Sequence, residues 1–154
     1  PLGAPVVSGK ADKTNYSELN KYKVVKNGSD IAIVGLGTFF SLGEKVYDRL
    51  KQAGFNPTLI NPKFITGLDE ALLEDLKNKH NVVITLEDGI LDGGFGQKIA
   101  SYYGDSEMKV LNYGGKKEFT DRVKVTDLYE RYRLTPDLIF EDVMRLQLGN
   151  LLYA

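Results

Sequence analysis

The fold of this chain is decided by residues 31–38, IAIVGLGT. The first four residues are a continuous apolar run, which is typical of a strand buried on both faces of a parallel sheet. Residues 41–53, which have apolar side chains at helical spacing, follow the glycine turn and end at Gly54. A buried strand that leads through a glycine turn into an amphipathic helix is the building unit of α/β folds.

The rest of the chain repeats this alternation of strand and helix. Three further apolar runs predict strands at residues 58–60, 81–86 and 110–113. A capping box at Thr66-x-x-Asp69 predicts a helix that runs to Leu76. Further helices are predicted over residues 96–103, over residues 126–132 and from a cap at Thr135 onward. Repeated units of this size imply a mostly parallel sheet with helices on both faces.

A short strand at residues 22–26 precedes the first buried strand and ends at an Asn27-Gly28 turn. Because a tight turn joins neighbouring strands, these two strands are predicted to pair with each other antiparallel. We therefore expect an α/β fold, a three-layer α/β/α sandwich around a five-stranded mixed, mostly parallel sheet. Residues 1–20 contain turn formers and little periodicity and are predicted to be a linker or arm, and residues 21–154 a single domain.

Composition narrows the classes of function. The formal net charge of -1 argues against a nucleic-acid partner, which would require a basic patch. The lack of cysteine excludes disulfides and a cysteine nucleophile, and a single histidine, His80, excludes a multi-histidine zinc site. No apolar run of the sequence is long enough to span a bilayer, so a membrane is not expected as a partner either. We expect a cytoplasmic protein.

The glycine turn at residues 35–38 has two interpretations. A turn between a buried strand and a helix can bind the phosphates of a nucleotide through backbone N–H groups. Phe40 occupies the position of the third glycine in that motif, and the next strand ends near Asn61-Pro62 without an acidic residue for a ribose. A tight turn that needs the backbone freedom of glycine is therefore the preferred interpretation.

The most unusual stretch is residues 87–96, EDGILDGGFG. It places carboxylates after a central strand, where ligands of open α/β sheets bind and where acid–base chemistry or Mg²⁺ binding would be located. No histidine or nucleophile pattern accompanies it, so an interface with another domain or subunit is the better-supported hypothesis. We predict no catalytic, cofactor-binding or metal-binding residue; the candidate interface residues are Glu87, Asp88, Gly93, Gly94, Phe95 and Gly96.

Two features concern the ends of helices. His80 follows a charged helix, in residues 77–80, and is predicted to be a cation that the helix dipole favours, without a catalytic role. The last helix continues into residues 148–154, LGNLLYA, an apolar tail that we expect to pack on the domain or on a partner.

Several segments, taken in order, resemble a known family. Residues 31–38 look like the first central strand and turn of the transketolase C-terminal domain. Residues 61–65, NPKFI, together with Leu68-Asp69, resemble a second segment of that domain. Residues 84–88, ITLED, together with residues 93–96, GGFG, resemble a third. Within that superfamily, residues 110–114, VLNYG, and 118–121, EFTD, look most like the C-terminal domain of 1-deoxy-D-xylulose-5-phosphate synthase. The resemblance runs from about Tyr22 to Leu146.

The resemblance implies an activity for a larger, homodimeric parent enzyme. That enzyme uses thiamine diphosphate and Mg²⁺ to join pyruvate and glyceraldehyde 3-phosphate, with loss of CO₂, into an isoprenoid precursor. Its Gly-Asp-Gly … Asn cofactor motif lies in the preceding domains, and the nearest match here, Gly104-Asp105-Ser106, departs at the third position. The resemblance therefore implies an assembly domain that contacts the preceding domains of the same polypeptide, binds no cofactor itself and is inactive alone.

Other identities stay open. The first alternative is the C-terminal domain of a transketolase, or of the thiamine-dependent subunit of an α-ketoacid dehydrogenase. A stand-alone nonenzymatic binding module of the same fold is another alternative. A nucleotide-binding protein that uses the turn at Gly35 is the last.

Overall fold

The computed structural model describes residues 21–63, 67–90, 94–115 and 133–153. The predicted linker at residues 1–20 and the predicted short helix at residues 126–132 lie outside this part of the chain. Within it, no helix is both long enough and apolar enough to cross a membrane.

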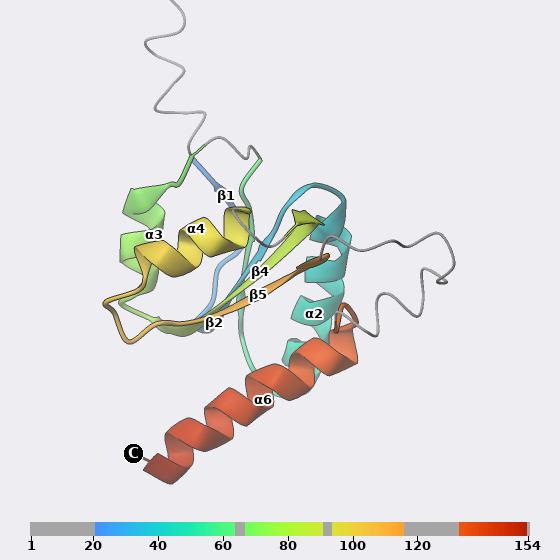
Figure 1. Cartoon of the computed structure of the whole chain (residues 1–154). Coiled ribbons are helices and arrows are strands. Elements are labelled where there is room, and N and C mark those ends of the chain that lie inside the picture. The colour runs from blue at the N-terminus through green and yellow to red at the C-terminus, as the bar shows by residue number, and fades with distance from the viewer. Residues whose placement is uncertain (1–20, 64–66, 91–93, 116–132, 154) are drawn as a thin grey trace, which may run out of the picture.

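A five-stranded sheet forms the centre of the fold (Figure 1). In spatial order its strands are β1 (Lys23–Lys26), β3 (Thr58–Asn61), β2 (Asp30–Gly35), β4 (His80–Ile90) and β5 (Lys109–Gly115). The pairs β2–β3, β2–β4 and β4–β5 are parallel, and β1 pairs antiparallel with β3. The predicted mixed, mostly parallel sheet with an antiparallel first strand is confirmed.

The prediction that the first two strands pair with each other is wrong, because β3 lies between them. After β1 the chain crosses the amino end of β3, where the Gly28 N–H donates to Thr58 Oγ1 at 2.9 Å and the Ser29 N–H to the Asn56 carbonyl at 2.7 Å. A Cβ on Gly28 would collide with that Asn56 carbonyl oxygen. The glycine therefore permits a close crossing of two backbones and does not form a hairpin turn.

Helices cover both faces of the sheet, which confirms the predicted three-layer sandwich (Figure 1). One face carries α3 (Glu70–Leu76) and α4 (Phe95–Tyr102); the other carries α2 (Phe40–Gln52), preceded by the short 3₁₀ helix η1 (Gly37–Phe39), and α6 (Pro136–Tyr153). In β2, Ile31 and Ile33 pack toward α2 and α6, whereas Ala32 and Val34 pack toward α3 and α4. Burial on both faces explains why this strand is apolar at four successive positions.

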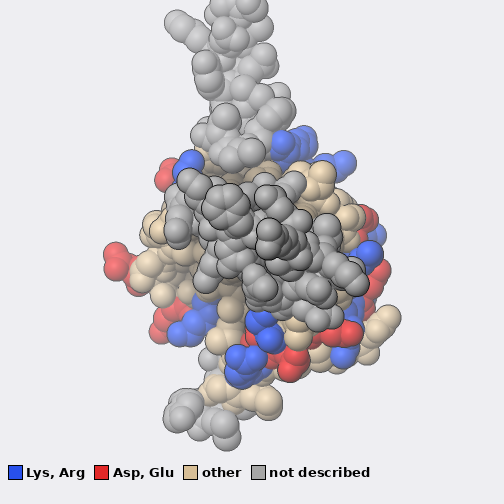
Figure 2. Space-filling model, turned by 45° about the vertical axis from the view of Figure 1, so that its right-hand side comes forward, with Lys and Arg blue, Asp and Glu red and all other residues tan. Residues whose placement is uncertain are grey.

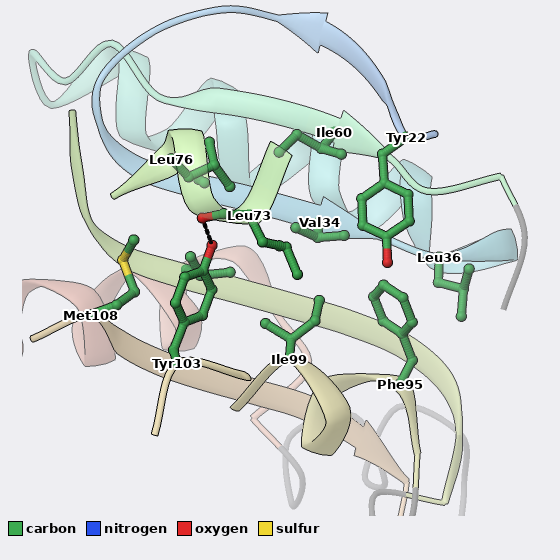
Figure 3. Close-up of a cluster of buried hydrophobic side chains, with 12 residues drawn as sticks. Tyr22, Val34, Leu36, Ile60, Leu73, Leu76, Phe95, Ile99, Tyr103 and Met108 are labelled. Atoms are coloured by element: carbon green, nitrogen blue, oxygen red, sulfur yellow. Dashed lines mark hydrogen bonds between the residues drawn. The ribbon is translucent and has the colours of Figure 1, made fainter. Parts of the chain in front are cut away.

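Figure 3 shows the core between the sheet and the pair α3 and α4. Tyr103, at the end of α4, donates its hydroxyl to the Leu73 carbonyl of α3 at 2.6 Å. Burial raises the pKa of Tyr103 far above its ordinary value, so the phenol stays a neutral donor. This hydrogen bond ties the two helices of the layer together inside the core.

Two helix starts test the capping predictions. Thr135 Oγ1 accepts a backbone N–H three residues along the chain at 3.3 Å, which confirms the cap of α6. The predicted capping box is wrong for α3, because Asp69 itself is the N-cap and accepts the Leu72 N–H at 3.2 Å. Thr66 lies outside the described residues.

Candidate interdomain surface at the carboxyl edge of the sheet

The ends of β2, β3, β4 and β5 form one edge of the sheet, here called the carboxyl edge; the opposite edge is the amino edge. β2 lies between β3 and β4, and the helices that follow β2 and β4 cover opposite faces. In open α/β sheets, ligands bind beside such a point, where the order of the strands reverses. The described parts of residues 87–96 lie at this position.

Glu87 is a buried carboxylate with only 5% of its surface exposed. Its Oε1 accepts the Phe95 N–H at 3.1 Å and its Oε2 accepts the Gly96 N–H at 2.6 Å. These are the first two residues of α4, whose N-cap, Gly94, has no side chain to cap the helix. Glu87 therefore caps α4 from the neighbouring strand, and its negative charge is favourable at a helix N-terminus.

Gly96 and Phe95 complete this junction inside the domain. The Thr85 hydroxyl donates to Asn112 Oδ1 at 2.6 Å, and this pair bridges β4 and β5 directly beneath Gly96. A Cβ on Gly96 would lie 2.6 Å from Asn112 Oδ1 and would also collide with Thr85 Oγ1. Phe95 is 2% exposed and packs against the ring of Tyr22, with 6.0 Å between the ring centroids (Figure 3).

The structure thus separates the candidate interface residues into groups. Glu87, Phe95 and Gly96 are buried and fix the start of α4, whereas Gly94 is half-buried at its N-cap. Asp88 lies in the last part of β4, and Gly93 lies outside the described residues. That residues 87–96 form an interface stays a prediction. Glu87, Phe95 and Gly96 would support such a surface from inside the domain.

The glycine turn after β2 has structural reasons for its glycines. A Cβ on Gly35 would lie 2.9 Å from the Cα of Phe40, and Gly37 has a φ of +61°. The Leu36 N–H donates to the Leu86 carbonyl at 2.8 Å, so it is used within the domain. These contacts support the tight-turn interpretation over a nucleotide-binding one.

Tyr22 fixes the place where the chain enters the domain, and sequence reasoning did not identify it. Its N–H donates to Asp69 Oδ2 at 2.9 Å, and its hydroxyl donates to the Gly67 carbonyl at 2.9 Å. Burial raises the pKa of Tyr22 to about 12. Since Lys23, the next residue, pairs with Asn61 at the end of β3, the chain enters at the carboxyl edge.

The turn after β3 holds a lysine at the same edge. Lys63 has a φ of +64°, which is a strained backbone conformation for a residue with a side chain. Its N–H donates to Asn61 Oδ1 at 3.0 Å, which stabilises the turn. The Lys63 side chain is exposed, so a positive charge is presented beside the entry point of the chain.

Asp142 of α6 connects the end of β5 to the segment that leads into α6. The Tyr113 hydroxyl donates to Asp142 at 2.7 Å, and the Arg133 and Arg145 guanidinium groups donate to it at 3.0 Å. Burial, followed by the bond to Asp142, raises the pKa of Tyr113 far above its ordinary value. The carboxylate therefore holds α6 and β5 together near the carboxyl edge.

His80 lies at the amino edge, away from this surface. Its Nδ1 is 3.0 Å from the Leu76 carbonyl and its Nε2 is 2.8 Å from Thr58 Oγ1. Because a carbonyl only accepts, Nδ1 carries the proton of the neutral ring and Nε2 accepts from the Thr58 hydroxyl. Burial lowers the pKa of His80. The ring does contact the end of α3, but the prediction that it is a cation there is wrong.

Acidic and histidine side chains do not gather into a metal-binding cluster among the described residues. Asp105, in the nearest match to the cofactor motif, is exposed in the turn between α4 and β5. On the face in Figure 2, acidic and basic side chains of the described residues are interspersed. No step of thiamine chemistry is assigned to this chain.

Comparison with known proteins identifies the class. Residues 20–139 match the family model described as "Transketolase, C-terminal domain". The chain therefore belongs to the transketolase C-terminal domain family, as the resemblance of its motifs indicates.

Curated relatives sharpen this result. A 1-deoxy-D-xylulose-5-phosphate synthase from Shouchella clausii is 35% identical over 130 residues, which are 83% of this chain and 21% of that protein. The synthase from Pseudoalteromonas translucida is 36% identical over 121 residues, or 77% of this chain and 19% of that protein. The chain spans about a fifth of the length of the curated relatives it matches.

Solved structures show the same fold. A chain described as "Split gene transketolase, inactive beta4 tetramer" superposes with a TM-score of 0.72 at 23% identity, covering 82% of this chain and 42% of that one. Transketolase from Campylobacter jejuni superposes with a TM-score of 0.56 at 17% identity, covering 83% of this chain and 19% of that one. These similarities confirm the fold class.

Proposed function

We propose that this chain is the C-terminal domain of a cytoplasmic, thiamine-diphosphate-dependent 1-deoxy-D-xylulose-5-phosphate synthase. That enzyme condenses pyruvate with glyceraldehyde 3-phosphate, with loss of CO₂, to form 1-deoxyxylulose 5-phosphate. The observation that carries the proposal is the 35% identity to a synthase over 83% of this chain. The transketolase structures are less than 25% identical and support only the shared fold, so the synthase is favoured over a transketolase.

The domain supports assembly and leaves the chemistry to the preceding domains. Thiamine diphosphate supplies the carbanion chemistry when bound, and a protein positions it. The cofactor motif departs at its third position in Gly104-Asp105-Ser106, and this chain contributes packing surface to a homodimeric parent enzyme.

The carboxyl edge is the surface that we assign to the preceding domains. Tyr22 brings the chain into the domain at this edge, so the polypeptide before it arrives there. Gly94 lies at the same edge, on a helix start that Glu87 holds rigidly from within. Lys63 adds an exposed positive charge in a fixed turn. A rigid, preformed surface lowers the entropic cost of docking.

A chimera tests this function. In the Shouchella clausii synthase, the segment that matches this chain is replaced by this chain, and formation of 1-deoxyxylulose 5-phosphate is measured. We expect the chimera to be active, and the same synthase without any C-terminal domain to be inactive. A well-folded chimera without activity would contradict the proposal.

A second measurement tests the division of labour. Thiamine diphosphate is titrated calorimetrically, with Mg²⁺ present, into this chain alone and into the chimera. We expect the chimera to release heat of binding and the isolated chain to release none. Micromolar binding by the isolated chain would show that it carries a cofactor site.

A further inference from the structure

β1 is the outermost strand on one side of the described sheet. Its inner edge pairs antiparallel with β3, and no other described strand lies beyond its outer edge. A strand at the edge of a sheet presents N–H and C=O groups along its outer side, and an extended peptide can pair with them. All four residues of β1 are exposed, so the described part of the domain leaves this strand accessible.

A groove of about 490 Å³ lies beside β1, between this strand and α3 (Figure 1). Val24 of β1 and Leu72 and Leu76 of α3 supply its apolar lining. Leu76 is almost completely buried, whereas Val24 is 39% exposed, so the groove has a firm apolar floor and a side chain that can take further contacts. Asp75 and Lys79 also line it and contribute one charge of each sign.

An irregularity in the pairing of β1 decides which side chains share a face of the sheet. Val24 pairs with Ile60, which packs toward α3 and α4, so Val24 faces the groove. The register shifts after Val24, and Lys26 pairs with Leu59, which packs toward α2 and α6. Lys23, the neighbour of Val24, faces the same side as Lys26, because successive side chains of a strand alternate. One face of β1 is therefore apolar and lies at the groove, and the opposite face carries two lysines.

The charges of β1 indicate what kind of strand can pair with it. Lys23 and Lys26 are exposed, and neither forms an ion pair with a described residue. A second copy of β1 would place lysine beside lysine, and like charges on neighbouring strands are destabilising. A strand with acidic side chains on the lysine face would instead form favourable pairs across the strands. On its other face the same strand needs aliphatic side chains, because the groove is lined by Val24 and two leucines.

We propose that β1 and the groove beside it bind an extended segment of another protein, in which acidic and aliphatic residues alternate. The segment adds a strand to the sheet at β1, and its backbone hydrogen bonds supply affinity. Its aliphatic side chains enter the groove beside Val24, and its acidic side chains lie beside Lys23 and Lys26. The groove extends to His80 at the amino edge, opposite the surface assigned to the preceding domains, so the proposal does not depend on the proposed function.

A blocked hexapeptide of alternating glutamate and valine, titrated into the 154-residue chain and followed by NMR, tests the proposal. We expect the backbone amides of Lys23–Lys26 and the methyl groups of Leu72 to shift, with a Kd of about 0.1 to 1 mM, because β1 is short. The same peptide with lysine in place of glutamate should bind about tenfold more weakly, since its charges oppose those of β1. A glutamate–valine hexapeptide with N-methylated peptide bonds should not bind, because it lacks the N–H groups that a strand donates.

Lys26→Glu supplies the sharper readout, because it should change the binding of the two charged peptides in opposite directions. It should weaken binding of the glutamate peptide by about fivefold and strengthen binding of the lysine peptide. Lys109→Glu is the matched control, an exposed lysine on β5 at the other side of the sheet, and should change neither.

Three results would overturn the proposal. The first is the absence of binding at peptide concentrations up to about 5 mM. The second is a set of shifts that lies away from β1 and α3. The third is equal binding of the glutamate and lysine peptides, which needs no variant to be folded. None of these outcomes alters the activity expected of the chimera, so failure here is distinguishable from failure of the proposed function.

Discussion

Replacement of Glu87 by alanine should destabilise the domain strongly, although no catalytic role is assigned to this residue. The substitution removes the acceptor of the Phe95 and Gly96 N–H groups, at 3.1 and 2.6 Å, in a site that water hardly reaches. Each buried donor left without a partner costs about 1 to 3 kcal/mol, so the loss of two partners should lower the free energy of unfolding by about 2 to 6 kcal/mol. Glu87→Gln keeps the shape and one acceptor oxygen and should cost roughly half as much.

Urea unfolding followed by circular dichroism measures this loss, and hydrogen exchange locates it. The amides of Phe95 and Gly96 should exchange much faster in Glu87→Ala, while amides of β2 change only with global stability. Glu44→Ala is the matched control, because Glu44 is an exposed carboxylate on α2 and should change stability by less than about 0.5 kcal/mol. If Glu87→Ala were as stable as Glu44→Ala, the capping role of Glu87 would be wrong.

Three further changes test other parts of the structure. Gly96→Ala should lower the free energy of unfolding by about 1 to 3 kcal/mol, because the new Cβ overlaps the Thr85–Asn112 pair beneath α4. Urea unfolding measures this loss, and an unchanged midpoint would contradict the close approach. Tyr103→Phe should cost about 1 to 2 kcal/mol through loss of the hydrogen bond to Leu73, and an equally stable variant would show that this bond is unimportant. The pKa of His80 is lower in the folded chain than in the unfolded chain, so His80 of the unfolded chain is protonated first as the pH falls. The free energy of unfolding should therefore decrease as the pH drops below about 6.5 toward the pKa of His80 in the folded chain. Unfolding midpoints at about pH 7.5 and 5.5 should differ less in His80→Gln, and an equal pH dependence would exclude His80 as its source.

The sequence predicts most of the architecture because the signals that determine it are local. The apolar run at residues 31–34 indicates burial on both faces, and helices on both faces follow from it. The cap at Thr135 is likewise readable from neighbouring residues. Such patterns report the environment of a residue directly.

The partner of β1 could not be read in this way. An Asn-Gly pair after a strand indicates a turn, but it does not say which strand lies next to the first one. The crossing depends on the carbonyl of Asn56, twenty-eight residues beyond Gly28, which comes close only after β3 has formed. Long-range contacts of this kind leave no local pattern.

The same limit applies to the candidate site and to His80. Carboxylates and glycines at residues 87–96 single out the end of β4 in the sequence. Whether Glu87 faces outward or caps α4 depends on where that helix begins. Tyr22 carries no motif, and its role emerges only when Asp69 comes within hydrogen-bonding distance. His80 is at the predicted end of a helix, and burial between α3 and β3, which periodicity does not report, decides its charge.

Hydrogen exchange of the active chimera, compared with the chain alone, tests the central claim most directly. Docking of the preceding domains at the carboxyl edge should slow exchange at residues 35–39 and 94–98, because a docked surface excludes water from their amides. The turn at residues 104–107, on the amino edge, should exchange at the same rate in both proteins. Slower exchange at residues 104–107, with no change at the carboxyl edge, would show that the preceding domains dock elsewhere and would contradict the claim.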